Sequence, residues 1–441
     1  MTQERPAARK RRFQALESSK PTKPVAKRSK KATPLQPPRL LNNETPTARL
    51  DVYVFGDGSA GELGLGTQDA TDVTGPRLNV NLEASTVGVV DIATGGMHAV
   101  ALTHDGKILT WGVNESTPTT IPSQSFAPES KIISVTAGDS ASFALTQQGH
   151  VYGWGTFVMQ SNEARKGFLL VQNQLIEKQE KPILIPGLED HSGRRLIVDR
   201  HSSAMVSEAQ LDKLYLNIGL VPSRVPFSPR IRIASIHAGS DHAFAIDYNG
   251  NTWTWSLNKF RQTGIKAGAG ANGTTIVTPQ KVQSLFGRKM KMIQGGTHHS
   301  VGVTQDGECL VWGRMDGAQM GIDISTLPIN DPKSVVSEHE KPRILLEPTA
   351  LPIAGCSYVA AGSDHNIVIT SEGRAYSWGF NANYQCGQGP NYDDITDATL
   401  IDNSAVRHRR LSWAGAGGQY SMLAGPHAEG DTPPRSDTFH S

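Results

Sequence analysis

Apolar and polar residues alternate along most of the chain in short segments that turn residues separate, a pattern that predicts β-strands. One phrase recurs in the same order: a small residue, Gly, two residues, His, apolar alternation, an Asp-Gly-type turn, and an aromatic residue followed by Gly. Each copy predicts a β-hairpin, because turns such as Asp105-Gly106 allow positive φ at both central positions. The copies are ATGGMHAVALTHDGKILTWG (93–112), TAGDSASFALTQQGHVYGWG (136–155), HAGSDHAFAIDYNGNTWTWS (237–256), QGGTHHSVGVTQDGECLVWG (294–313) and AAGSDHNIVITSEGRAYSWG (360–379).

Both ends of the repeat region carry half of a further copy, VYVFGDGSAGELGLG (52–66) and WAGAGGQYSMLAG (413–425). Together they predict one sheet made from both ends, which closes a ring without a long exposed edge. Trp154 and Trp255 are 101 residues apart, about two repeats. We therefore expect an all-β, seven-bladed β-propeller over 49–425, with a degenerate blade within 156–230. The alternatives for that stretch are a divergent insertion or a wrongly joined piece of coding sequence.

The net charge of +2 is the sum of two regions with net charges of opposite sign. Residues 1–40 hold 12 Lys/Arg against 2 acids, which leaves 31 against 39 in the rest of the chain. Two basic clusters with Pro and Ser between them predict a disordered tail over 1–48, and 426–441 is a second disordered end. The clusters indicate nuclear import and contact with chromatin phosphates or acidic histone patches, and the alternative is an ordinary solvated terminus. Their residues are Arg9, Lys10, Arg11, Arg12, Lys27, Arg28, Lys30 and Lys31.

The composition also argues against several classes of protein. Three cysteines without a CxxC pair disfavour a zinc site and a disulfide framework. The sequence has no run of eighteen apolar residues, so it predicts no membrane span. We find no triad, paired carboxylate or metal cluster with convincing spacing, so we predict no catalytic residue, metal or cofactor. The expected protein is a monomer in a reducing compartment and not an enzyme of bond chemistry.

The repeated Gly-x-x-His corner, paired with Gly-Glu-Leu-Gly-Leu-Gly (61–66), resembles the chromosome-condensation-regulator family, especially its fungal form, over about 50–425. The resemblance implies a nuclear, chromatin-bound guanine-nucleotide exchange factor for the small GTPase Ran. It also implies three partners: Ran itself, the nucleosome or DNA through the basic tail, and an import receptor. Related propellers have other functions, so the fold alone does not decide between them.

The resemblance also proposes the residues that meet the GTPase. The loop TFVMQSNEARKGFLLV (156–171) is similar to the family's β-wedge, a hairpin that enters the nucleotide site, although it has an extra VMQ and Ala164-Arg165-Lys166 at its turn. The alternative for this loop is a variable surface loop. The proposed GTPase-binding residues are Phe157, Asn162 and Glu163 in the loop, and His98, Asp139, Asp241, His298 and Asp364 at the Gly-x-x-His corners.

Other repeat positions have simpler interpretations. We expect His242, His299 and His365 to be structural and to donate hydrogen bonds to neighbouring backbone. His98 occupies the same slot, so a structural role competes with GTPase binding there. Arg200 stands where the family has an acid, and this departure, with those in the wedge, supports an alternative function, a non-exchange scaffold that binds chromatin or another protein.

Overall fold

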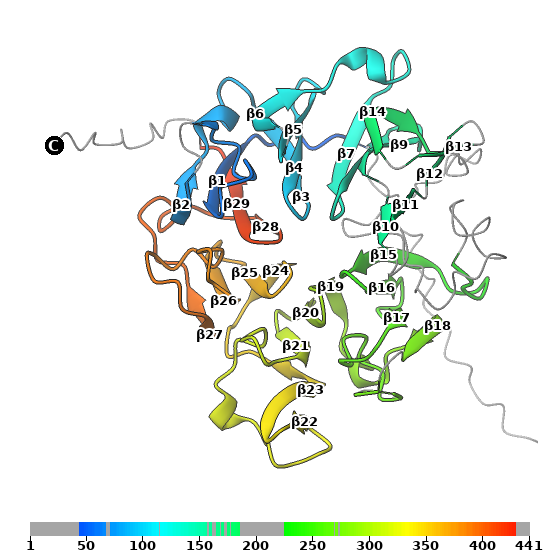
Figure 1. Ribbon diagram of the computed structural model, residues 1–441, viewed down its shortest axis with the longest axis vertical. Coiled ribbons are helices and arrows are strands. Elements are labelled where there is room, and N and C mark those ends of the chain that lie inside the picture. Colours follow the sequence, from blue (N-terminus) through cyan, green and yellow to red (C-terminus); the bar gives the residue numbers. More distant parts are fainter. Residues whose placement is uncertain are drawn as a thin grey trace, which may run out of the picture. The chain divides into compact units, whose positions relative to one another are not determined.

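Six antiparallel sheets of four or five strands account for most of the described part of the chain, and they are arranged around a common centre (Figure 1). The computed structural model describes residues 44–67, 71–113, 115–156, 178–185, 225–268, 270–271 and 274–428, and the backbone of four short strands between 158 and 176. The chain divides into two units, Met1–Leu40 and Leu41–Ser441, and all described residues belong to the second.

We number the blades 1 to 5 along the chain and call the last one the closing blade. Blade 1 contains β3 (Val89–Thr94), β4 (His98–Thr103), β5 (Ile108–Gly112) and β6 (Glu115–Thr120). Blade 2 contains β7 (Ile132–Ala137), β8 (Ala141–Thr146), β9 (Val151–Thr156) and β14 (Lys178–Leu184). Blade 3 contains β15 (Ile233–Ala238), β16 (His242–Asp247), β17 (Thr252–Leu257) and β18 (Thr275–Lys281).

Blade 4 has five strands, β19 (Met290–Gly295), β20 (His299–Thr304), β21 (Cys309–Arg314), β22 (Val335–Glu338) and β23 (Lys341–Ala350). Blade 5 contains β24 (Cys356–Ala361), β25 (His365–Thr370), β26 (Ala375–Gly379) and β27 (Ile395–Leu400). The closing blade joins β1 (Leu50–Gly56) and β2 (Val73–Leu78) to β28 (Trp413–Ala416) and β29 (Tyr420–Pro426). Short 3-10 helices lie in the connections, η2 (Val80–Leu82), η3 (Ser123–Ser125), η5 (Gln283–Leu285) and η6 (Ile324–Thr326).

The prediction that both chain ends share a sheet is confirmed. Strand β1 pairs with β29 along its whole length, from Leu50 opposite Pro426 to Gly56 opposite Tyr420. Trp111, Trp312 and Trp378, which close three of the repeats, are fully or almost fully buried in the core between blades. Closure by this antiparallel pair leaves neither chain end as a free sheet edge in the closing blade.

The prediction of seven blades is wrong, because the described residues form six. Part of the long interval after Trp154 is used by β14, which pairs with β9 as the outer strand of blade 2. Another part forms two short hairpins, β10 (Val158–Gln160) with β11 (Arg165–Gly167) and β12 (Leu169–Val171) with β13 (Gln174–Ile176). Residues 186–224 lie outside the described residues. The spacing of aromatic residues overcounted the blades because it assigned these connections to a further sheet.

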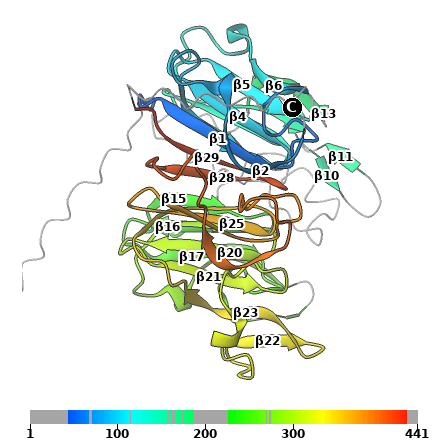
Figure 2. The same cartoon turned by 90° about the vertical axis from the view of Figure 1, so that its left-hand side faces the viewer.

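The blades present two faces, which Figure 2 shows from the side. The turn between the first and second strand of each blade, and the long loop after the third strand, lie on what we call the Gly-x-x-His face. The Asp-Gly turns between the second and third strands lie on the opposite end, the Asp-Gly face. Residues 44–49 run along the Asp-Gly face, where Thr45 Oγ1 donates to Ile132 O at 3.0 Å and Arg49 Nη1 donates to Ala84 O at 3.2 Å.

Candidate functional site

Glycine is required at the Gly-x-x-His corner because two blades approach each other there. A Cβ at Gly296 would collide with the His299 ring of its own repeat and with the Gly362 carbonyl of the next blade. The corner backbones also bond from blade to blade, as when Gly96 N donates to Asp139 O at 3.0 Å and Gly418 N donates to Gly96 O at 2.8 Å. The corners therefore form a closely packed inner rim on the Gly-x-x-His face.

Each repeat histidine bonds to a side chain of the following blade. Nε2 of His242 lies 2.7 Å from Ser300 Oγ, and Nε2 of His299 lies 2.8 Å from Asn366 Oδ1. His365 makes the same contact with Ser421 at 2.8 Å. The predicted structural role of these three histidines is confirmed, but their Nε2 partners are side chains of the next blade instead of backbone groups.

His98 also makes this inter-blade contact, with Nε2 at 2.9 Å from Ser142 Oγ. Burial lowers the pKa of His98 to about 4, while the nearby Asp139 opposes the shift, so the ring is neutral at pH 7. The structure thus places His98 between blades 1 and 2. Its role in GTPase binding stays a prediction.

In two of the junctions, two further residues donate to the same loop carbonyl. Ser300 Oγ and Trp312 Nε1 both donate to Gln262 O at 2.8 Å. In the next junction, Asn366 Nδ2 and Trp378 Nε1 donate to Gln319 O at 3.0 and 2.8 Å. The Trp of the repeat is thus both a core residue and a hydrogen-bond donor to the preceding blade, which stabilises the position of the loops on the Gly-x-x-His face.

Asp139 lies at the centre of this face. It lines an open pocket of about 250 Å³ that the corners of all six blades surround, mostly with glycine backbone. Its carboxylate accepts a hydrogen bond from Ser140 Oγ at 2.8 Å and is otherwise exposed. Asp139 is the charged residue in the described lining of the pocket, so the pocket presents a carboxylate to an approaching partner.

Asp241, His298 and Asp364 form a second group on the same face, in blades 3, 4 and 5. Partial burial lowers the pKa of His298, and the carboxylates of Asp241 and Asp364 act in the opposite direction. Partial burial likewise raises the pKa of Asp241, which His298 counteracts. Asp364 Oδ1 accepts a hydrogen bond from Gln319 Nε2 at 2.9 Å. The structure therefore brings three of the five predicted corner residues into one electrostatic group.

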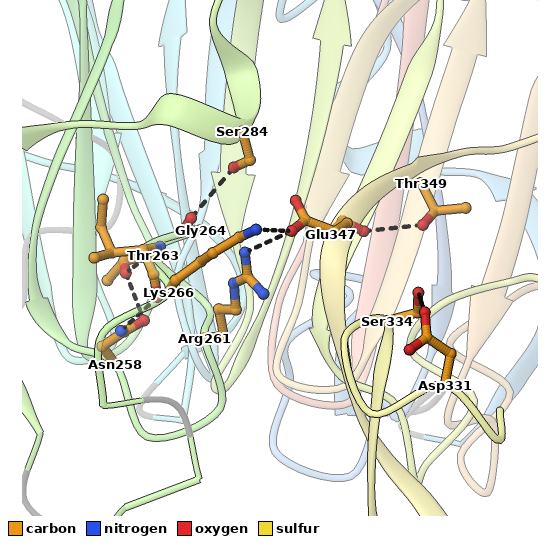
Figure 3. Close-up of polar contacts among 11 residues, drawn as sticks. Asn258, Arg261, Thr263, Gly264, Lys266, Ser284, Asp331, Ser334, Glu347 and Thr349 are labelled. Atoms are coloured by element: carbon orange, nitrogen blue, oxygen red, sulfur yellow. Dashed lines mark hydrogen bonds and ion pairs between the residues drawn. The ribbon is translucent and has the colours of Figure 1, made fainter. Parts of the chain in front are cut away.

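The loop of blade 3 that follows β17 contacts β23 of blade 4 beside this group. Arg261, whose side chain is 2% exposed, and Lys266 both form ion pairs with Glu347, at 3.1 and 3.0 Å (Figure 3). The adjacent Phe260 packs on Ile344 and Leu346 of the same strand. Sequence reasoning missed these residues, although the loop motif NKFRQTG (258–264) recurs as NANYQCG (381–387) and could have been found with the other repeats.

Several predicted residues cannot be placed. Phe157, Asn162 and Glu163 lie outside the described residues, although the predicted hairpin is present as β10 and β11 (Figure 1). All eight basic residues of the tail, Arg9, Lys10, Arg11, Arg12, Lys27, Arg28, Lys30 and Lys31, also lie outside them. In the described part of the chain no group of three His, Cys, Asp or Glu residues could hold a metal ion. No helix in that part is long and apolar enough to cross a membrane.

Residues 51–423 match the family model described as the RCC1-like domain. The chain is 34% identical to the protein pim1 of Schizosaccharomyces pombe, over 87% of this chain and 76% of that protein. It is 30% identical to the guanine nucleotide exchange factor SRM1 of Saccharomyces cerevisiae, over 85% of this chain and 87% of that protein.

Two solved structures of yeast proteins are similar over most of the chain. One is that of Prp20p from Saccharomyces cerevisiae, described with its binding properties to Gsp1p and histones. It is 29% identical, has a TM-score of 0.77, and covers 88% of this chain and 94% of its own. The other is yeast RCC1 (Prp20) bound to Kap60, at 28% identity and a TM-score of 0.77, which covers 93% of this chain and 97% of its own.

Proposed function

Because this chain belongs to the RCC1-like family, we propose that it is a guanine-nucleotide exchange factor for the small GTPase Ran. Its relatives include a named exchange factor and a yeast protein studied for binding to Gsp1p, the yeast form of Ran. Exchange forms no covalent bond, so the site needs a surface that recognises the GTPase and no catalytic dyad or triad.

The observation that carries the proposal is the grouping of polar residues on the Gly-x-x-His face. Asp139 stands at the central pocket, and Asp241, His298 and Asp364 stand beside it on blades 3 to 5. Carboxylates on this face would attract a basic group of the GTPase near its nucleotide site. Residues 44–49 run along the opposite, Asp-Gly face and do not cover these residues.

The physical basis of exchange is reciprocal coupling. A propeller that binds the nucleotide-free GTPase more tightly than the nucleotide-bound form lowers the affinity for nucleotide by the same factor. Both GDP and GTP are then released faster, and the cellular excess of GTP over GDP sets the net direction. The hairpin β10–β11 is the candidate wedge, with Phe157, Asn162 and Glu163 as its candidate contacts.

The test is the release of labelled GDP from purified Ran with and without this protein. We expect strong acceleration by the unmodified chain, and slower release with Asp139→Asn, which removes the charge at the pocket but keeps the shape of the side chain. Asp306→Asn is the matched control, because it removes an exposed charge from an Asp-Gly turn on the opposite face and leaves a good turn residue. Release that micromolar protein does not accelerate contradicts the exchange function and favours the scaffold.

The proposed setting is the nucleus, on chromatin. The yeast relative is described with binding to histones and, in a second structure, with Kap60, an import receptor. In this chain the corresponding contacts would come from the basic clusters RKRR (9–12) and AKRSKK (26–31). Lys and Arg in such a segment bind phosphates by releasing counterions, so this binding should weaken steeply as salt is raised.

A further inference from the structure

Phe260 occupies a loop position that does not need an aromatic residue. Four loops on the Gly-x-x-His face share one geometry, in which a backbone N–H donates to a Gln or Glu side chain two residues later at 2.8 to 2.9 Å. The residue between them has a positive φ in all four loops. The donors are Ala60, Phe260, Gly317 and Asn383. The loop therefore forms equally with Ala, Gly or Asn, and the phenyl ring has another role.

The ring of Phe260 contacts the His298 ring. Their centroids are 4.7 Å apart at an interplanar angle of 53°. Phe260 is 6% exposed and packs on Ile344 and Leu346, while the ion pairs of the neighbouring Arg261 and Lys266 with Glu347 hold the loop on the same strand (Figure 3). Phe260 is thus fixed from one side by blade 4 and supports His298 with the other.

Three cations surround the same ring. Lys259 Nζ, Arg314 Cζ and Arg343 Cζ lie 5.5, 5.7 and 5.4 Å from its centroid. Asp316 pairs with Arg314 at 2.5 Å and with Arg343 at 3.9 Å, which keeps both guanidinium groups near the ring. Lys259 and Arg314 disfavour a positive charge on His298, whereas Asp241 and Asp364 favour it. Arg343 is also paired with Glu338.

The two ring nitrogens of His298 have different surroundings. Nδ1 is buried and has no hydrogen-bond partner among the described residues, so the neutral ring is more stable without a proton on Nδ1. The neutral ring then carries its proton on Nε2. Protonation would place an N–H at Nδ1 without an acceptor, and would also offset the negative charges of Asp241 and Asp364 that flank His298. The buried His299 is the remaining titratable neighbour.

We propose that Phe260 is a positioning residue that holds His298 as a neutral Nε2–H donor on the exchange face. The inference rests on the proposed function, because His298 acts there on the GTPase. With His298 neutral, no positive charge on its ring offsets the carboxylates of Asp241 and Asp364 where a basic group of the GTPase would bind. Removing the phenyl ring admits water to His298 and lets it become protonated in the range of an ordinary histidine, near pH 6.5.

The first experiment follows the titration of His298 by NMR in the full chain labelled on histidine, with His298→Gln to assign the signal. In Phe260→Leu, which keeps an apolar side chain but no ring, His298 should titrate about 6.5, and in the unmodified chain clearly lower. Phe260→Tyr keeps the ring and should restore the lower value. Asn383→Ala changes the same loop position in blade 5 and should leave His298 unaffected. An unchanged titration of His298 in Phe260→Leu overturns the inference, whatever the exchange activity.

The second experiment measures exchange on Ran at pH 7.5 and 6.0. A histidine with a pKa of about 6.5 is roughly three-quarters protonated at pH 6.0, so kcat/KM of Phe260→Leu should fall about fourfold relative to pH 7.5. The unmodified chain and Phe260→Tyr should fall less than twofold. The fall should vanish in Phe260→Leu/His298→Gln, and its persistence there overturns the inference. If the unmodified chain does not accelerate exchange, the proposed function is refuted, but the role of Phe260 is not, because the NMR titration tests that role separately.

Discussion

Asn366→Ala is a sharp test of how the blades are held together. Asn366 is fully buried and bonds to two neighbours, as acceptor for His299 Nε2 at 2.8 Å and as donor to Gln319 O at 3.0 Å. The substitution leaves the buried Nε2 of His299 without a partner, whereas Gln319 O keeps its bond from Trp378 Nε1. The loss therefore falls mainly on the contact between blades 4 and 5.

The expected loss of stability follows from these bonds. An unpaired buried polar group costs about 1 to 3 kcal/mol, and the lost bond to Gln319 O adds about 1 kcal/mol. Asn366→Ala should therefore lower the free energy of unfolding by about 2 to 4 kcal/mol. Asn366→Ser is the matched control, because Ser300 and Ser421 fill the same slot and make the same two bonds. Its cost should stay under about 1.5 kcal/mol.

The assay is urea unfolding followed by tryptophan fluorescence, since Trp378 shares the Gln319 carbonyl with Asn366. With a slope of about 2 to 3 kcal/mol per molar urea, Asn366→Ala should shift the midpoint down by about 1 M. His299→Ala combined with Asn366→Ala should cost clearly less than the sum of the two single changes, because they remove one interaction. Equal losses for Asn366→Ala and Asn366→Ser, or strict additivity of the pair, would refute the reasoning.

Three further predictions follow from other features. Tyr420→Phe removes a hydroxyl that donates to Gly95 O at 3.2 Å and to His98 O, and should lower the free energy of unfolding by about 1 to 2 kcal/mol in the same urea assay. Burial lowers the pKa of His98 and of His365 to about 4, so the folded protein is fully stable above pH 6.5 and loses stability as the pH falls. At pH 5 each histidine should lower the free energy of unfolding by roughly 2 kcal/mol. Urea midpoints at pH 7.5 and 5.0 measure this loss, which His365→Gln should reduce. Deleting residues 1–40, which carry 12 Lys/Arg, should abolish salt-sensitive nucleosome binding in a gel-shift titration and leave GDP release from Ran in solution nearly unchanged.

The repeat predicted five complete blades and the closing blade because each carries its own local signals. Alternation, an Asp-Gly-type turn and an aromatic-Gly end are short-range features, and the strands form where these occur. The blade number could not be predicted in the same way, since it came from a distance along the chain and an assumed closure. Connections such as β14 and the hairpins β10–β11 and β12–β13 carry strands without the repeat phrase, so spacing alone miscounts them.

The candidate site was partly predictable for a related reason. Asp241, His298 and Asp364 lie on one face because they hold equivalent positions of the repeat, and Asp139 lies one position earlier in the same corner. Phe260, in contrast, interacts with residues of the next blade, and its partners Ile344 and Leu346 lie more than eighty residues later in the chain. A single sequence does not place such positions together, although the recurring loop motif marks Phe260 as the aromatic exception.

Some blades lack the repeat histidine, and the reason is found in the neighbouring blade, at the residue that this position contacts. Tyr420 replaces a histidine in the closing blade, and the following blade has Ala99, which has no side-chain hydrogen-bond acceptor, so the tyrosine hydroxyl reaches the backbone at Gly95 instead. Blade 2 has Ala141 at the histidine position, and among the described residues no backbone hydrogen bond joins blade 2 to blade 3. Five junctions between blades thus have complementary residues at this position. In these junctions the residue at the histidine position matches the residue that it meets in the following blade, so a departure from the repeat in one blade is paired with a departure in the next.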